Sequence, residues 1–220
     1  MRKLKVLELF AGTRSIGKAF EKNGHEVYSI DWDEQHKDMD WYTDILNVTA
    51  QDIIEKFGKP DVIWASSDCS TFSVAAISHH RNKEEDGTLS PKTEKAKKAD
   101  LVNQHVIELI EELQPKYYFM ENPRGGMRKA RYMQDLPRYT VSYCQYGDTR
   151  MKPTDIWTNH PNPQFKPMCK NGAPCHTPAP RGSRTGTQGL KNNVLRSVIP
   201  NELCEHVVSI CEKDWEDETN

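Results

Sequence analysis

The chain has 220 residues, of which 36% are hydrophobic and 28% are charged. That length predicts one domain with a sizeable core. The near balance of 30 basic and 32 acidic residues argues against a chain that is basic over its whole surface, although a local basic groove remains compatible with it. No stretch approaches the length and apolarity of a transmembrane helix.

The N-terminal sequence MRKLKVLELF runs directly into a strand pattern, which leaves no room for a signal peptide. The six cysteines are scattered along the chain, as is typical of a protein in a reducing compartment. We therefore expect a cytoplasmic protein.

Short apolar runs alternate with amphipathic segments over the first 125 residues. In chain order we expect a strand at residues 5–10, a helix at 15–23, a strand at 26–30, a helix at 50–57, a strand at 61–65, a helix at 96–113 and a strand at 116–120. Strands separated by helices in this way predict an α/β fold with a doubly wound, mostly parallel sheet.

Two segments interrupt this pattern. Residues 74–98 are polar and charged and predict a long active-site loop, since a long loop inside a compact domain is usually functional or disordered. Strand-like sequence returns at residues 138–160, after which residues 161–193 are rich in Pro, Gly, Thr and Asn and predict an irregular segment. A last helix is expected at residues 200–213, and residues 1–220 are expected to form a single domain.

Small residues follow the first expected strand in the turn Phe10-Ala-Gly-Thr-Arg-Ser-Ile-Gly17. Such a turn lets the backbone approach a ligand at a helix N-terminus. Asp31 ends the second strand, where a carboxylate can bind the hydroxyls of a ribose, and Asp44 lies where it can meet an adenine amino group. These features predict a nucleoside cofactor; the alternative is an ordinary sheet whose acids cap helices.

Two chemically reactive side chains follow later strands. Cys69 lies in Ser66-Ser-Asp-Cys-Ser-Thr-Phe-Ser73, directly after the strand at 61–65, where a doubly wound sheet binds its substrates. Because its neighbours carry hydroxyls, it is predicted to be a partly exposed nucleophile rather than a packing residue. Glu121 ends the strand at 116–120 and can exchange a proton with a bound base.

Taken together, Phe10-Ala-Gly12, Asp31, Asp44, Cys69 with Phe72-Ser73, and Glu121-Asn122 resemble the cytosine-C5 DNA methyltransferase family. The chain looks most like a short, phage-type branch without a separate target-recognition domain, for which residues 161–193 are too short. If a phage encodes it, the compartment is the host cytoplasm.

The resemblance implies S-adenosylmethionine as cofactor, DNA as partner and no metal. It implies a cofactor pocket formed by Glu8, Phe10, Ala11, Gly12, Gly17, Asp31, Trp32, Asp44, Ile45 and Ser66. Asp31 would bind the ribose, Trp32 would lie against the adenine and Asp44 would face its amine. Cys69 would be the nucleophile, Glu121 its partner and Arg150 a substrate-contacting arginine.

Several positions depart from the family pattern. Arg14 and Ser15 stand near its glycine pair, and Asp68 replaces the proline before the nucleophile, where its negative charge opposes thiolate formation. Gln145 and Arg150 are further apart than the pattern expects. These departures keep three hypotheses open: methylation of cytosine in DNA, the same chemistry on a free deoxycytidine nucleotide or RNA, and a catalytically silent protein that binds cofactor or DNA.

Two further groups stand out. Arg124, Arg128, Lys129 and Arg131 form a basic cluster suited to phosphate contacts, or a solvated surface. Cys169, Cys175 and His176 contain metal-ligating side chains, but C-x5-C-H is not a recognised zinc pattern, so free thiols are expected.

Overall fold

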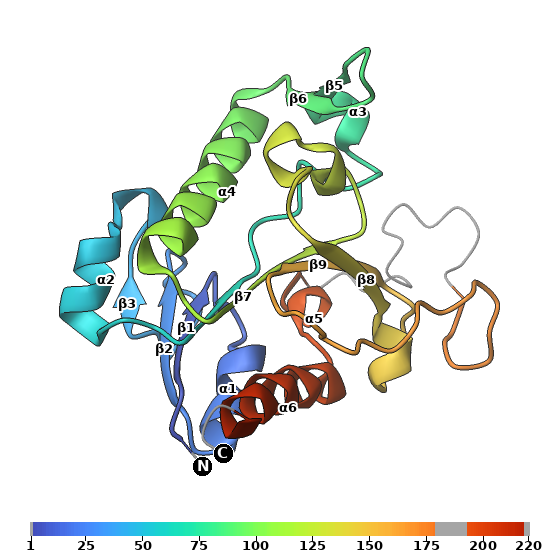
Figure 1. Cartoon of the computed structure of the whole chain (residues 1–220). Helices are drawn as coiled ribbons and strands as arrows, with labels where there is room; N and C mark the ends of the chain where they lie inside the picture. The colour runs from blue at the N-terminus through green and yellow to red at the C-terminus, as the bar shows by residue number, and fades with distance from the viewer. Residues whose placement is uncertain (1, 179–192, 218–220) are drawn as a thin grey trace.

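The computed structural model describes residues 2–178 and 193–217. Its centre is a seven-stranded sheet, seen nearly edge-on in Figure 1, with the strand order β3-β2-β1-β4-β7-β9-β8. The strands are β1 (Lys5–Leu9), β2 (Glu26–Asp31), β3 (Trp41–Tyr42), β4 (Val62–Ala65), β7 (Tyr117–Pro123), β8 (Arg138–Ser142) and β9 (Pro153–Thr158). The pairs from β3 to β7 are parallel, and β9 pairs antiparallel with both β7 and β8. The predicted mostly parallel sheet is confirmed.

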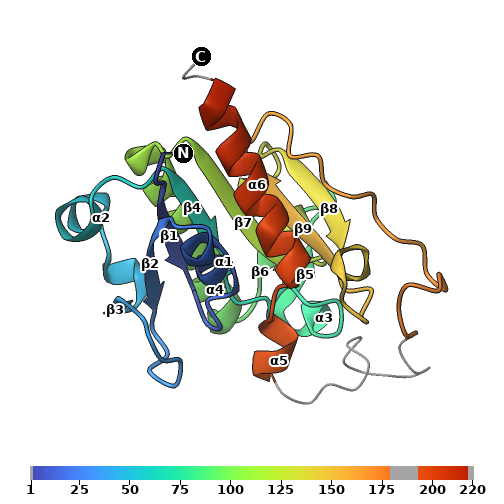
Figure 2. The ribbon, with the colours of Figure 1, turned by 90° about the horizontal axis from the view of Figure 1, so that it is seen from below.

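Helices cover both faces of the sheet, as Figure 2 shows from below. One face carries α1 (Ser15–Lys22) and α6 (Asn201–Asp217), and the other carries α2 (Ala50–Phe57) and α4 (Glu94–Leu113). Each face closes its own buried hydrophobic cluster, which is the doubly wound arrangement that the alternating sequence predicts.

Local signals explain where the helices begin. Thr49 and Asp52 form a reciprocal capping box at the start of α2, and the hydroxyl of Thr93 accepts a hydrogen bond from the amide of Ala96 at the start of α4. At its other end α4 stops at Gln114 in a left-handed conformation, immediately before Pro115.

The segment at residues 74–98 differs from the predicted loop. It contains the short helix α3 (Ile77–His80) and the antiparallel hairpin of β5 (Arg81–Lys83) and β6 (Leu89–Pro91), and α4 already begins at Glu94. The hairpin is held at its base by the buried Arg81, whose guanidinium donates to the backbone oxygen and the hydroxyl of Thr71 and pairs with Asp100. These tertiary contacts order a stretch whose sequence has no strand periodicity.

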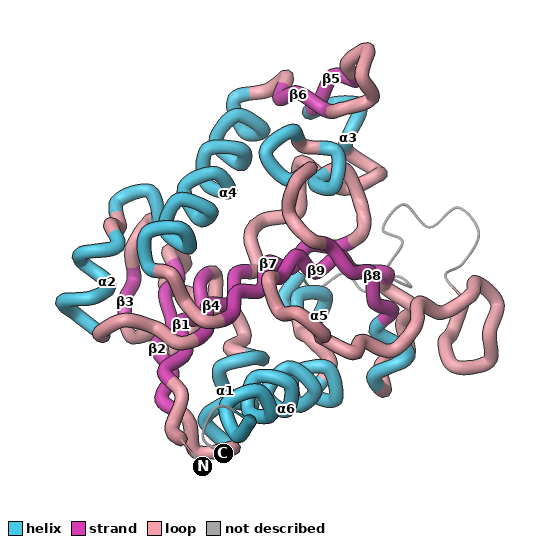
Figure 3. Tube along the Cα trace, viewed as in Figure 1, coloured by secondary structure: helices cyan, strands magenta, loops and turns pink. Residues whose placement is uncertain are grey.

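The region after β9 is irregular, as predicted, within residues 161–178, which Figure 3 draws as loop. The rest of the predicted irregular segment, residues 179–192, lies outside the described residues. The chain resumes with α5 (Asn193–Ser197) and α6. Within residues 2–178 and 193–217, no helix combines the length and apolarity that a membrane crossing requires.

Candidate functional site

The predicted site residues converge on one edge of the sheet. Strands β1, β2, β4 and β7 run parallel, so the turns that follow them lie at the same edge. The chain winds outward in one direction from β1 to β3 and in the other from β4 to β7, which puts the reversal of strand order between β1 and β4. Ligands of doubly wound sheets bind at such a point.

The turn after β1 is built from residues in the left-handed region: Phe10 has φ 56°, Gly12 has φ 49° and Arg14 has φ 54°. Non-glycine residues rarely adopt this conformation, and they tend to cluster where a site constrains the backbone. Arg14 thus takes a glycine-like backbone where the family pattern has glycine, and its Nε donates to the Ser29 hydroxyl at 2.9 Å. Arg14 therefore keeps the left-handed backbone of the turn without a glycine at this position.

Glu8 lies buried beneath this turn. Its two carboxylate oxygens accept hydrogen bonds from the amides of Ile16 and Gly17 at 3.2 and 3.1 Å, so it holds the start of α1 in place. Burial raises the pKa of Glu8 to about 7, against the opposing effect of those amides. A side chain at Gly17 would put its Cβ 2.5 Å from Glu8 Oε2, which explains why this position is glycine.

Asp31 closes the other side of the turn. One carboxylate oxygen accepts from the Gly12 amide and the other from the Asp33 amide, both at 2.9 Å. Each oxygen keeps a lone pair for a further donor, which is what binding a ribose requires. Beside it, 68% of the Trp32 side chain is exposed, so this ring is free to lie against a flat ligand.

Asp44 lies just after β3, and Ser66 directly follows β4. Asp44 accepts from the Leu46 amide and from Lys98 Nζ at 2.8 Å, and the hydrogen bond from Lys98 lowers the pKa of its carboxyl. Ile45, next in the chain, is buried. Ser66 is half-buried and accepts a hydrogen bond from the Trp64 indole.

Cys69 sits in a tight turn after β4, with its backbone oxygen accepting from the amides of Phe72 and Ser73, each at 3.0 Å. The turn is tied to β7 by the side-chain amide of Asn122, which donates to the backbone oxygen of Ser67 at 3.1 Å. Asn122 follows Glu121 directly, so this bond fixes the turn of Cys69 relative to the strand that carries Glu121. The structure thus brings the predicted pair to one place.

Opposing influences set the reactivity of Cys69. Burial, and then the negative charges of Asp68 and Glu121, raise the pKa of its thiol, while the positive charge of Lys152 lowers it. Glu121 is itself buried and accepts a hydrogen bond from the Tyr143 hydroxyl at 3.2 Å. Burial and two carboxylates thus favour the thiol form of Cys69, and Lys152 opposes them.

Arg150, predicted to contact the substrate, is followed two residues later by a second cation, Lys152. Arg150 is buried, its guanidinium forms an ion pair with Asp148, and it also donates to the Leu195 backbone oxygen at 3.3 Å. Lys152, two residues on, is the cation that acts on both Cys69 and Glu121. Sequence reasoning missed Lys152. The sequence carries no periodic signal for it, because Lys152 lies outside the strands and has a positive φ of 27°.

A cleft of about 780 Å³ opens beside the turn of Cys69. It lies between α3 with the hairpin on one side and the segment after β7 on the other, and its lining includes Val74, Ile77, Arg81, Lys83, Leu89, Lys92, Arg124, Gly126, Arg128 and Lys129. The Gly126 amide donates to the Phe72 backbone oxygen at 2.7 Å, so the cleft borders the turn of Cys69. Basic side chains thus line a cleft next to the turn of Cys69.

The predicted basic cluster is only partly available to a ligand. Arg128 is committed to the buried Asp155, and Arg131 forms an exposed ion pair with Asp86 in the hairpin turn at 2.7 Å. Arg124 and Lys129 are exposed on the cleft.

Similar proteins agree with this architecture. A family model described as C-5 cytosine-specific DNA methylase matches residues 4–136. A curated relative, the "Probable DNA (cytosine-5)-methyltransferase" of Frog virus 3 (isolate Goorha), is 32% identical over 165 residues, covering 71% of each chain.

Two solved structures share the fold at low identity. The S. pombe Dnmt2 methyltransferase matches with a TM-score of 0.50 and 15% identity over 71% of this chain and 49% of its own. The Entamoeba histolytica methyltransferase EhMeth matches with a TM-score of 0.51 and 13% identity over 72% and 53%. The chain thus spans about half the length of these two structures. By its family-model match and its viral relative, it belongs to the family of C-5 cytosine-specific DNA methylases, which are S-adenosylmethionine-dependent DNA (cytosine-5)-methyltransferases.

Proposed function

We propose that the enzyme methylates carbon 5 of cytosine in DNA through a covalent bond between Cys69 Sγ and carbon 6 of the base. The observation that carries this proposal is the bond from Asn122 to Ser67, which holds the Cys69 turn against the strand of Glu121. Cys69 and Glu121 both lie at the edge where the parallel strands end, and Lys152 supplies a positive charge to both.

Each of these residues has a defined task. The Cys69 thiolate adds to carbon 6, and the displaced electron pair makes carbon 5 a nucleophile. Glu121, carrying a proton when the base is bound, donates it in a hydrogen bond to N3 and so stabilises the negative charge that develops there, and Lys152 favours the thiolate over the thiol. After methyl transfer, carbon 5 loses its proton and the Cys69 bond breaks.

We assign the cofactor pocket to the turn after β1 and the ends of β2 and β4. Bound S-adenosylmethionine supplies the methyl group from its sulfonium. The residues fit that group: Asp31 keeps acceptor capacity for two hydroxyls, Trp32 offers an exposed ring, and the left-handed turn exposes backbone around Gly12. Phe10, Ala11 and Ser66 complete the pocket, while Glu8 and Gly17 shape it from beneath.

Asp31→Ala is expected to weaken S-adenosylmethionine binding by about 1–3 kcal/mol, because the ribose loses its acceptor and the Gly12 amide loses its partner. Titration calorimetry measures the affinity, and thermal unfolding checks that the fold is kept. Asp33→Ala, two residues along the same loop, is the control and keeps wild-type affinity. Equal affinity of Asp31→Ala and wild type would remove Asp31 from the site.

We further propose that duplex DNA lies along the basic cleft with the target cytosine flipped out toward Cys69, at a cost of a few kcal/mol of unstacking. Residues 74–98, with the hairpin of β5 and β6, act as the lid over the base. The hairpin lines the cleft, and it meets the opposite wall through the exposed pair of Arg131 and Asp86. A phosphate competes directly with Asp86 for Arg131.

We place the enzyme in a short, phage-type branch that acts in the cytoplasm of its host, with residues 161–193 in place of a separate target-recognition domain. The relative from a frog virus supports a viral source, and six free cysteines are typical of a protein in a reducing compartment such as the cytoplasm. Base reading would then fall to the hairpin and to the segment at 161–193.

The substrate is tested by supplying S-adenosylmethionine with a labelled methyl group together with duplex DNA, RNA or deoxycytidine nucleotide. We expect label in DNA alone, released as 5-methylcytosine on digestion. Label in RNA or nucleotide would mean that the same reaction acts on that substrate instead of DNA. No label in any of the three, with cofactor binding retained, would make the protein a silent binder.

A further inference from the structure

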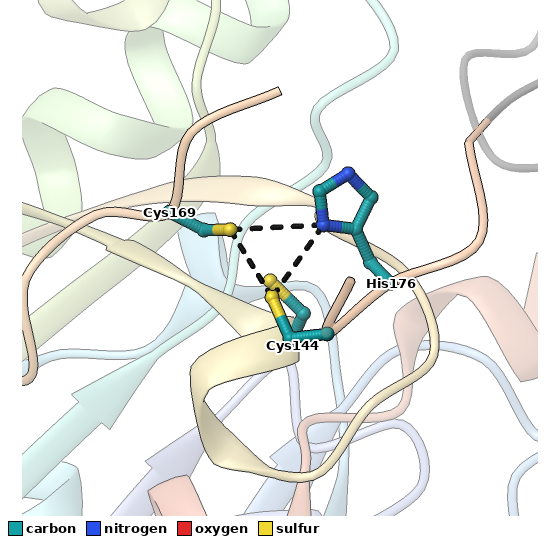
Figure 4. A group of neighbouring side chains, drawn as sticks. Cys144, Cys169 and His176 are labelled. Carbon is teal, nitrogen blue, oxygen red and sulfur yellow. Dashed lines mark hydrogen bonds between the residues drawn. The ribbon is translucent and has the colours of Figure 1, made fainter. Parts of the chain in front are cut away.

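Three cysteines and one histidine gather at the end of the sheet opposite β3, outside the methyl-transfer site. Cys144 lies in the 3-10 turn η4 (Tyr143–Tyr146) that follows β8, whereas Cys169, Cys175 and His176 come from the irregular segment after β9. Figure 4 shows the side chains of Cys144, Cys169 and His176 turned toward a common point. The sulfur atoms and the ligating nitrogen of the four residues all lie within 4.8 Å of one another.

The separations between His176 Nδ1 and the sulfurs match those around a tetrahedral ion. With metal–sulfur bonds of about 2.3 Å and a metal–nitrogen bond of about 2.0 Å, tetrahedral angles put two sulfurs about 3.8 Å apart and sulfur and nitrogen about 3.5 Å apart. His176 Nδ1 lies 3.6 Å from the sulfurs of both Cys169 and Cys175. The sulfurs of Cys169 and Cys175 are 3.2 Å apart, well beyond the roughly 2 Å of a disulfide.

The imidazole of His176 supports a ligand role independently. The residue is only 8% exposed although it lies in a loop, and Nδ1 faces the sulfurs while Nε2 has no hydrogen-bond partner among the described residues. A buried polar ring in a loop with no strong partner costs free energy. A metal bond to Nδ1 replaces its weak contacts with the two sulfurs and offsets part of the cost of burying the ring, while Nε2 carries the ring proton.

We propose that Cys144, Cys169, Cys175 and His176 bind one structural Zn²⁺ ion. Three cysteines and one histidine form one of the ligand sets of closed zinc sites, in which protein side chains fill all four positions and none is left for a substrate. The ion has no part in methyl transfer, so this proposal stands apart from the proposed reaction.

The zinc fastens the segment after β9 to the sheet at a place that matters for the site. Two hydrogen bonds flank the three ligands in this segment. The Cys169 amide donates to the Ser142 hydroxyl, and the Thr177 amide donates to the Thr149 backbone oxygen. Thr149 precedes Arg150 in the connection between η4 and β9. The ion therefore fixes the loop that leads to Lys152.

The sequence alone does not give this site because the fourth ligand is remote. C-x5-C-H lacks a familiar spacing, and Cys144 falls in strand-like sequence well before it. Cys144 meets the other three ligands because the segment after β9 turns back along β8.

Elemental analysis of the purified wild-type protein is expected to find one zinc per chain. Cys144→Ser, Cys169→Ser, Cys175→Ser and His176→Ala should each lower zinc content by roughly tenfold or more. The controls Cys69→Ser and Cys204→Ala remove cysteines outside the cluster and should retain full zinc. Co²⁺ bound in place of zinc should show the visible bands of tetrahedral thiolate coordination in wild type.

Chelation provides a readout that does not depend on any variant folding. Removing zinc from the wild type should lower its unfolding temperature, and adding Zn²⁺ should restore it. Wild type that is purified without zinc and gains no thermal stability from added Zn²⁺ would overturn the proposal. So would iron in place of zinc, or a Cys169–Cys175 disulfide found by mass spectrometry of protein purified without reductant.

Discussion

Wild-type enzyme is expected to stay joined through denaturation to DNA that contains 5-fluorocytosine, and Cys69→Ser is expected to lose this adduct completely. With fluorine in place of the carbon 5 proton, the final elimination cannot occur, so the bond from sulfur to carbon 6 persists after methyl transfer. A serine hydroxyl is hardly ionised near neutral pH and adds to the base far more slowly. A denaturing gel with labelled DNA measures the adduct.

The adduct should form only when S-adenosylmethionine is present, because methyl transfer is the step that traps it. Cys69→Ser should still bind the cofactor in calorimetry, which separates a lost nucleophile from a lost fold. Cys204→Ala, a buried cysteine in α6, should keep the adduct. An adduct that survives in Cys69→Ser would mean that another cysteine is the nucleophile, and no adduct in wild type would favour the silent binder.

Lys152→Met is expected to lower kcat by about 10²-fold at neutral pH, a loss typical of removing one charge-stabilising group from an active site. The positive charge of Lys152 lowers the pKa of the Cys69 thiol. Its removal raises that pKa, so the rising limb of the pH–rate profile moves to higher pH. The loss should therefore shrink as the pH increases. Single-turnover rates across pH, with cofactor and DNA saturating, measure this.

Asp68→Asn is the matched variant, and it is expected to shift the pH–rate profile in the opposite direction. The Asp68 charge raises the pKa of Cys69, whereas the amide keeps an oxygen that accepts from the Ser70 amide, so the rising limb should move to lower pH. Lys152→Arg should recover part of the rate because it keeps the charge. If Lys152→Met lost rate equally at every pH, Lys152 would act on substrate positioning rather than on the thiolate.

Sequence patterns located the residues that follow parallel strands. Asp31, Cys69 and Glu121 each follow a short apolar run, and parallel strands bring such positions to one edge whatever the details of packing. Arg14 was harder to interpret, because a left-handed arginine at φ 54° leaves no mark in the sequence. The same holds for Glu8, whose carboxylate turned out to hold α1 from beneath the turn.

Residues that depend on a chain reversal could not be located in this way. Lys152 reaches the Cys69 and Glu121 pair because β9 returns antiparallel beside β7, and Cys144 meets His176 because the segment after β9 turns back along β8. Neither arrangement has a periodic signature. The hairpin at 81–91 was missed because buried contacts of Arg81 with Thr71 and Asp100 order it.

The position of α6 has a consequence for how the protein is made. Leu203, Val207 and Cys211 of this last helix share a buried cluster with Val6 and Phe20 from the start of the chain. Lys22 and His25 are joined to Glu205 and Glu212 of α6 as well. A ribosome makes α6 after the strands and helix on which it packs, so the nascent chain exposes one apolar face of its sheet until α6 has been made. Chains that stop after β9 should accumulate as aggregates or be degraded, even though every predicted catalytic side chain has by then been made.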